Sequence, residues 1–130
     1  MITFVGLNPA IDRSLEVNGF EIGGVAKARL LALQPAGKAA NAARVFAELG
    51  GRCRLAGFIG QGEAALYSES FANLQVDLDF TRVAGSTRIN TTLIHRDLGC
   101  DTHIREAGFQ VSASEIEKLE EKLLSLAREG

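Results

Sequence analysis

The sequence has few of the residues that mark metal-binding, disulfide-rich or nucleic-acid-binding proteins. Among 130 residues there are two cysteines and two histidines. Cys53 and Cys100 are too far apart for a CxxC metal-binding pair and too few for a disulfide framework, so we expect reduced, packed thiols in a cytoplasmic protein. His95 and His103 stand roughly symmetrically about Gly99 and could be cross-strand neighbours. Two ligands without a third make a poor metal site, so we expect exposed or packed histidines and no metal.

An excess of basic residues and long hydrophobic runs are also missing. Lys and Arg total 14 against 16 Asp and Glu, and no basic run concentrates positive charge, so nucleic acid is not an expected partner. The first apolar run ends at Asn8-Pro9, which argues against a signal peptide or a membrane span. With 46% hydrophobic and 23% charged residues, the chain is expected to fold as one globular domain or part of one.

Short apolar runs alternate with helical periods, a pattern typical of the α/β class. The residue before Pro35 favours an extended conformation, so a long helix should begin after it and end at Gly50-Gly51. Ser112 and Glu115 form a capping-box sequence that should start a final helix ending near Gly130. The other expected elements are a buried strand over 2–7, extended segments over 15–20 and 25–33, a strand over 54–59, a helix over 63–74, a third core strand over 76–80, and a hairpin over 88–96 and 102–106.

The same periodicity predicts which helix positions are buried. The expected buried stripes are Ala42, Val45, Phe46 and Leu49 in the first helix, Ala64, Tyr67, Phe71 and Leu74 in the second, and Ile116, Leu119, Leu123 and Leu126 in the last. No strand follows the last helix, although a strand–helix–strand unit needs one. We therefore expect the chain to be the front part of something longer.

Two glycine-containing segments resemble nucleotide-binding loops. A Walker A loop is excluded because Ala32 and Ala39 stand where its first glycine and its hydroxyl residue would be. The segment from Gly60 to Ala65 matches a loose G-x-G-x-x-A pattern, with Asp77 and Asp79 downstream, which is a weak dinucleotide-binding signal. The alternative reading is a plain strand-to-helix turn, because Glu63 would face an anionic pyrophosphate.

The loop at 35–41 is the strongest candidate site. Gly37, Lys38 and Asn41 stand where the first long helix begins, and a helix N-terminus offers unpaired N–H groups to a phosphorylated or polyhydroxylated ligand. Asp12 follows the first strand, on the side where parallel sheets bind ligands, and a carboxylate there can accept hydrogen bonds from sugar hydroxyls. The alternative readings are a tightly packed helix start and a turn aspartate.

Five separated motifs together resemble one family. They are TFVGLNPAID at 3–12, PAGKAANAARVFAELG at 35–50, GFIG at 57–60, STRIN at 86–90 and EAGFQVSASE at 106–115. In order and spacing they are similar to the ribokinase/PfkB sugar kinases, above all the branch of 1-phosphofructokinase and tagatose-6-phosphate kinase. The resemblance covers essentially the whole chain but only the N-terminal part of such an enzyme.

The resemblance implies a ribokinase-like fold, a three-layer αβα arrangement around a parallel sheet, with a small β-sheet lid that often mediates dimers. The core would comprise approximately residues 1–12, 36–83 and 106–130, and the lid approximately 13–35 and 84–105. The expected partners are a phosphosugar and a second copy of the chain bound through the lid.

The resemblance also implies roles for individual residues. Asp12 would bind sugar hydroxyls, Gly37 and Asn41 would line the pocket, and Lys38 would reach the substrate. Lys27 and Arg88 would hold the substrate phosphate, and Asn90 of the STRIN motif joins them as a substrate-binding candidate. Ala39, Ala40 and Glu63 depart from the family pattern.

Phosphoryl transfer further requires ATP, Mg²⁺ and a catalytic base, which the family keeps in its C-terminal half. No Gly-Ala-Gly-Asp-like motif occurs here, so no catalytic, cofactor-binding or metal-binding residue is assigned, and the isolated chain is expected to be inactive. The leading hypothesis is thus the sugar-binding part of an ATP-dependent kinase for a phosphorylated hexose. The alternatives are a non-catalytic binding or dimerisation module and a dinucleotide-binding oxidoreductase domain that uses Gly60 and Gly62.

Overall fold

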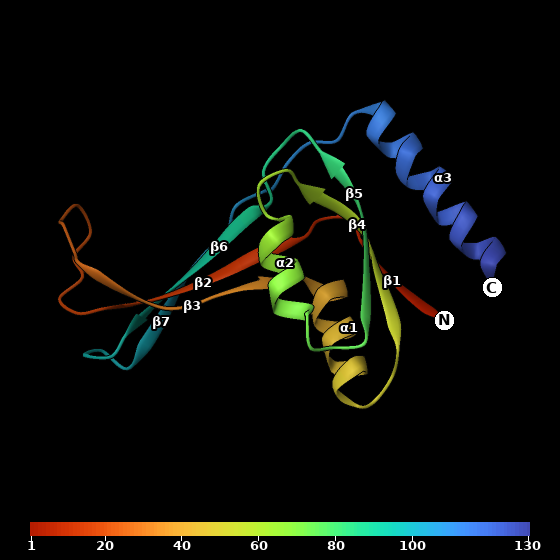
Figure 1. Cartoon of the computed structure of the whole chain (residues 1–130). Helices are drawn as coiled ribbons and strands as arrows, with labels where there is room; N and C mark the ends of the chain where they lie inside the picture. Colours follow the sequence, from red (N-terminus) through yellow and green to blue (C-terminus); the bar gives the residue numbers. More distant parts are fainter.

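A computed structural model describes all 130 residues, which form two β-sheets and three helices. Figure 1 shows β1, β4 and β5 beside the helices, while β2, β3, β6 and β7 form an arm that extends away from them. The elements, in chain order, are β1 (Ile2–Gly6), β2 (Ala10–Val17), β3 (Ala28–Ala36), α1 (Lys38–Glu48), β4 (Cys53–Gly60), α2 (Ala64–Phe71), β5 (Val76–Val83), β6 (Arg88–His95), β7 (Cys100–Ile104) and α3 (Ala113–Glu129).

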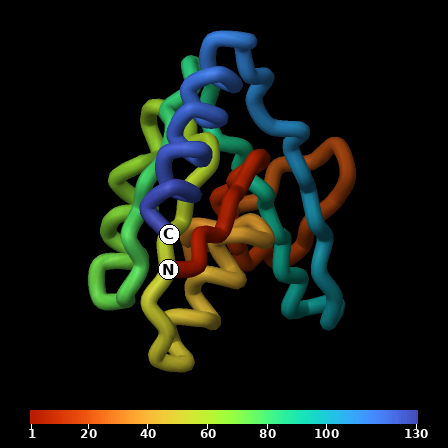
Figure 2. Tube along the Cα trace, turned by 90° about the vertical axis from the view of Figure 1, so that its right-hand side faces the viewer, coloured from red at the N-terminus to blue at the C-terminus, as the bar shows by residue number.

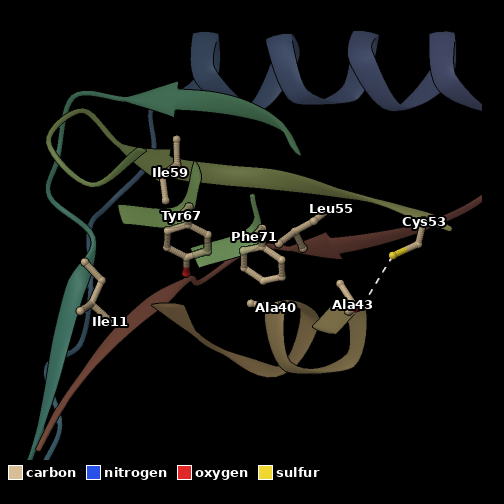
Figure 3. Close-up of a cluster of buried hydrophobic side chains, with 8 residues drawn as sticks. All are labelled: Ile11, Ala40, Ala43, Cys53, Leu55, Ile59, Tyr67 and Phe71. Carbon is tan, nitrogen blue, oxygen red and sulfur yellow. Dashed lines mark hydrogen bonds between the residues drawn. The ribbon is translucent and has the colours of Figure 1, made fainter. Parts of the chain in front are cut away.

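The first sheet is parallel and has the strand order β1-β4-β5. Parallel neighbours need crossover connections, and α2 joins β4 to β5 while α1 precedes β4. Helices α1 and α2 lie on one face of this sheet and α3 lies on the other (Figures 1 and 3). The expected α/β fold with helices on both faces of a parallel sheet is confirmed.

The first strand forms where it was predicted, but it is not buried. β1 is an edge strand, and Ile2 and Val5 are 51% and 39% exposed. The reason is that β1 has a strand partner only on the β4 side, and that α3 packs on Phe58 and Val83 of β4 and β5 rather than on β1.

Helix α1 begins after Pro35 as predicted but buries a different face. Its buried residues are Ala40, Ala43 and Ala47. Phe46 of the predicted stripe packs against the core, whereas Ala42, Val45 and Leu49 are exposed. Small residues face the sheet because the helix lies close to it. A Cβ at Gly6 of β1 would already be 3.3 Å from the Cβ of Ala39.

The main core lies between the parallel sheet and helices α1 and α2 (Figure 3). Tyr67 and Phe71 of α2 are buried there as predicted, and Leu74 packs against the cluster from its edge. The Tyr67 hydroxyl lies 2.8 Å from the carbonyl oxygen of Ala10 and 3.0 Å from that of Ala36. The side chain therefore connects the core to the first residue of β2 and the last residue of β3.

The second sheet has the order β3-β2-β6-β7. β2 is antiparallel to β3 and parallel to β6, and β6 is antiparallel to β7. The extended segments predicted over 15–20 and 25–33 are thus real strands, but β2 begins earlier, at Ala10. This sheet occupies the ranges that the resemblance assigned to a lid.

His95 and His103 of this sheet are not cross-strand neighbours, and Cys100 is not buried. Thr92 is the partner of His103 and Cys100 is the partner of His95, so strand alternation puts the two imidazoles on opposite faces. His95 is buried, with Nε2 2.8 Å from the hydroxyl of Thr102. Cys53 is buried as expected, but Cys100 is exposed because it begins the outermost strand.

Helix α3 starts at the predicted capping box. The Glu115 N–H donates to the Ser112 hydroxyl at 3.1 Å, and the Ser112 N–H donates to the Glu115 carboxylate at 2.9 Å. Leu119 is buried, but Ile116 is 41% exposed, so that part of the predicted stripe is wrong. The C-terminal end of α3 lies near the N-terminus of the chain (Figure 2). None of the helices is long and apolar enough to cross a membrane.

Candidate functional site

The cavity between the start of α1 and the second sheet gathers most of the predicted site residues. It has a volume of about 360 Å³ and includes six of the seven substrate-binding candidates. The six come from three separate stretches of the chain, since β2 supplies Asp12, the start of α1 supplies Gly37, Lys38 and Asn41, and β6 supplies Arg88 and Asn90.

Strand register explains why the sheet residues meet. Asp12 and Asn90 are direct partners in the parallel β2–β6 ladder, and Arg88 is paired with Ala10 two positions earlier. Since alternate residues of a strand share a face, Asp12, Asn90 and Arg88 stand on one surface of the sheet. The amide oxygen of Asn90 is buried without a hydrogen-bond partner within the chain, so its hydrogen-bonding capacity is unused.

The start of α1 forms the second wall of the cavity. Gly37 precedes the helix with φ of 102°, a conformation that side-chain-bearing residues rarely adopt, and no side chain caps the helix. No acidic residue occupies its first turn, and Lys38 is the first helical residue. The unpaired N–H groups and the ammonium group together favour an anionic or hydroxyl-rich ligand at this end of the helix.

Arg88 is held loosely, which leaves its guanidinium free to bind a ligand. Its Nε lies 3.4 Å from the carbonyl oxygen of Pro9 and its Nη2 lies 3.5 Å from that of Asn8, both long for hydrogen bonds. The next residue of β6 is held more firmly, because the Ile89 N–H donates to the carboxylate of Glu106 at 2.8 Å. The backbone at Arg88 is therefore positioned while its charge is uncompensated by any carboxylate within ion-pair distance.

Lys27 does not reach the cavity. It immediately precedes β3, whose first residue, Ala28, pairs with Val17 at the opposite end of β2 from Asp12. Within one copy of the chain, Lys27 and Arg88 are not brought together.

The structure adds residues that the sequence interpretation missed. Thr92, His103 and Arg105 also border the cavity, from β6, β7 and the residue after β7. The interpretation weighed His103 as a metal ligand and favoured an exposed or packed side chain, but not a residue of the cavity. The register of the β6–β7 hairpin is the signal that places these residues beside Asn90, and the sequence does not fix that register.

A second, more apolar cavity of about 260 Å³ adjoins the first and shares Gly37, Lys38 and Arg88 with it. Tyr67 borders this second cavity. Burial raises the pKa of Tyr67 to about 12, against the opposing effect of its contacts with the carbonyl groups of Ala10 and Ala36. The phenol is thus a neutral hydrogen-bond donor at the base of the site.

The glycine pattern at 60–65 does not form an open phosphate-binding loop. The Gly60 N–H donates to the Thr87 hydroxyl at 2.9 Å, and a Cβ at Gly60 would overlap the Glu63 carboxylate and the Thr87 backbone. Because the chain itself fills the space over Gly60, no room remains for a pyrophosphate. The geometry argues against a dinucleotide at this loop.

Fold and site together define a class: an α/β protein whose carboxylate, amide and cationic side chains gather in a cavity beside a helix start. Comparison with known proteins specifies the family. The pfkB family carbohydrate kinase pattern matches residues 1–129. The chain belongs to the pfkB family of carbohydrate kinases.

Individual relatives agree with this assignment. The chain is 36% identical over 128 residues to a 1-phosphofructokinase of Vibrio cholerae, covering 98% of this chain and 40% of that protein. It is 28% identical over 129 residues to a tagatose-6-phosphate kinase of Staphylococcus epidermidis, covering 99% of this chain and 41% of that protein. It thus spans about 40% of the length of the curated relatives it matches.

A solved structure confirms the fold. The crystal structure of phosphofructokinase-2 from Escherichia coli in complex with fructose-6-phosphate superposes with a TM-score of 0.85 at 22% identity. The match covers 95% of this chain and 41% of that one. At this identity the likeness concerns the fold alone.

Proposed function

We propose that this chain is the sugar-phosphate-binding part of an ATP-dependent kinase that phosphorylates a phosphorylated ketohexose such as fructose 1-phosphate or tagatose 6-phosphate. One observation carries the proposal: β2, the start of α1 and β6 bring a carboxylate, two side-chain amides, the helix-start glycine and the cations Lys38 and Arg88 to one cavity. Membership of a carbohydrate kinase family supports it.

Each residue has a role that follows from its chemistry. Asp12 accepts hydrogen bonds from sugar hydroxyls, while Asn41 and the amide oxygen of Asn90 complete the polar surroundings of the sugar. Arg88 offers a planar guanidinium that matches a phosphate group, and Lys38 adds a second positive charge. Gly37 allows the backbone to turn into α1 without a side chain in the cavity.

ATP and Mg²⁺ are proposed to bind residues of the complete enzyme outside this chain. Among these 130 residues no group of three or more histidine, cysteine, aspartate or glutamate side chains is placed to hold a metal ion. We assign no magnesium ligand to this chain. Its residues bind and orient the phosphosugar, and the isolated chain is predicted to show no kinase activity.

Calorimetric titration of the chain with fructose 1-phosphate and tagatose 6-phosphate tests the proposal. Saturable binding is expected, and the Asp12→Ala and Arg88→Ala variants should each weaken it at least about tenfold, since a hydrogen bond to a charged group contributes about 1.5–3 kcal/mol. Glu48→Ala, at the exposed end of α1, is the matched control and should bind as the unsubstituted chain does. Equal affinity in all four proteins would refute the assignment of this cavity.

We also propose that two copies associate through the second sheet. Leu30, Leu33 and Ile104 are 55%, 45% and 52% exposed on its two outer strands, and unpaired strand edges favour association. Lys27 could contact a substrate phosphate only in such an assembly. Sedimentation analysis should show a dimer that Leu30→Glu with Leu33→Glu dissociates, and a monomeric unsubstituted chain would exclude this arrangement.

The same exposed leucines favour the second candidate, a non-catalytic dimerisation module. This candidate predicts the dimer without phosphosugar binding, so the calorimetric titration separates it from the first.

A further inference from the structure

We propose that Arg105, with His103 beside it, is a specificity-determining residue that binds the phosphate group of the substrate together with Arg88. The inference rests on the proposed function and names the group in the cavity that distinguishes a phosphosugar from a neutral sugar. Arg105 borders the cavity, as do His103 and Arg88.

The hairpin register places Arg105 beside the proposed sugar-binding pair. Thr92 is the partner of His103, and Thr91 is the partner of Ile104. Continuing this antiparallel ladder by one step sets Arg105 opposite Asn90, which is itself the partner of Asp12 on the other side. Asp12 of β2, Asn90 of β6 and Arg105, which directly follows β7, thus form one row across the sheet.

Arg88 and Arg105 are diagonal neighbours on this face. Arg88 lies two residues before Asn90 on β6, so its Cβ is expected roughly 7–8 Å or less from that of Arg105. Two long, flexible side chains starting at that separation can place both guanidinium groups on one phosphate. Planar guanidinium groups bind phosphate oxygens in pairs, which favours a phosphate over a hydroxyl as their common ligand.

The charge of the cavity supports an anionic ligand. Lys38, Arg88 and Arg105 contribute three positive charges against the single carboxylate of Asp12. None of these three cations forms a salt bridge, whereas Arg29 and Arg96 share the carboxylate of Glu16 elsewhere on the same sheet. A phosphate dianion would neutralise the excess charge.

His103 adds a directional hydrogen-bonding group next to Arg105. Its Nδ1 lies 3.2 Å from the Thr92 hydroxyl, which fixes the ring and leaves Nε2 for a ligand. Arg105 itself is exposed and forms no side-chain hydrogen bond within the chain, so replacing it removes a charge from the cavity without removing a structural contact.

The test compares a phosphorylated with a neutral ligand by calorimetry on the 130-residue chain. Fructose 1-phosphate and fructose are titrated into the unsubstituted chain and into Arg105→Gln, Arg105→Lys and Arg128→Gln. Arg128 is an exposed arginine in the last turn of α3 and provides the matched control.

Arg105→Gln should weaken fructose 1-phosphate binding about tenfold and leave the affinity for fructose unchanged, because only a charged hydrogen bond to phosphate is lost. Arg105→Lys should recover part of the loss and Arg128→Gln should show none. Unchanged affinity for fructose 1-phosphate in Arg105→Gln, while Asp12→Ala has lost it, would overturn the role of Arg105 alone. Absence of saturable fructose 1-phosphate binding by the unsubstituted chain would overturn the proposed function and this inference together.

Discussion

Replacing Tyr67 by phenylalanine should destabilise the protein by removing one oxygen atom. The hydroxyl shares its proton between the carbonyl oxygens of Ala10 and Ala36, at 2.8 and 3.0 Å, and the side chain is 1% exposed. Phenylalanine keeps the ring that packs on Phe71 and Phe80, so the hydrophobic contacts are retained. Two buried carbonyl groups lose a donor, for which we expect a loss of about 1–3 kcal/mol in the free energy of unfolding.

Urea denaturation followed by circular dichroism measures this loss. The midpoint should fall while the dependence of the free energy on urea concentration stays the same, because the surface exposed on unfolding does not change. A midpoint equal to that of the unsubstituted chain would refute the claim that the Tyr67 hydroxyl stabilises β2 and β3 through the carbonyl groups of Ala10 and Ala36. Phe71→Leu changes the packing of the core and keeps the Tyr67 hydroxyl, so a loss of stability in that variant does not bear on the hydrogen bonds of Tyr67.

The ionisation of Tyr67 provides an independent check on the same environment. The chain has one tyrosine and no tryptophan, so phenolate absorbance reports this side chain alone. Burial raises its pKa to about 12, compared with about 10 in an unfolded chain. The stability that the neutral phenol contributes is therefore complete below about pH 10 and is lost as the pH rises toward 12. Titration near pH 10 in the folded protein would contradict the burial.

Three further predictions concern the scaffold. Gly57→Ala should cost about 3 kcal/mol in urea denaturation, because φ at Gly57 is 127° and a Cβ would overlap the Gly6 carbonyl, and unchanged stability would contradict the close approach of β1 and β4. Ser112→Ala should cost about 1 kcal/mol through loss of the helix cap, measured in the same way, and a neutral effect would exclude the capping box. Hydrogen bonds from the Ser112 and Ala84 N–H groups lower the pKa of Glu115, so its contribution is present above the unfolded pKa and is lost on acidification. Glu115→Gln should flatten the fall in stability at acid pH, and an unaltered pH profile would argue against this contact.

Local signals in the sequence predicted where the elements lie. The extended preference before Pro35 and the small residues after it place the start of α1, and the Ser112–Glu115 pair places the start of α3, because both depend on contacts between near neighbours. Burial was harder to predict. Periodicity selected Val45 and Leu49 of α1, which are exposed, whereas the close approach of the helix to Gly6 at Ala39 favours small residues facing the sheet.

Some residues of the candidate site could likewise be predicted from local signals, whereas others depend on strand register. Asp12, Gly37 and Lys38 follow from a general rule, that ligands bind beyond strand ends and at helix starts. His103 and Arg105 depend on the register of a hairpin, and a shift of one residue would have turned both to the other face. Lys27 lies away from the cavity within one copy of the chain, because the position of a residue in a motif does not indicate how far along the sheet its strand begins.

The most direct test of the account is to map phosphosugar binding onto the backbone by amide chemical shifts. Addition of fructose 1-phosphate should shift the resonances of Gly37–Asn41, Asp12 and Asn90 in a saturable way, and leave those of α3 unchanged. Saturable shifts confined to other parts of the chain, or none at all, would contradict the claim that the start of α1 and the second sheet together hold a phosphorylated sugar.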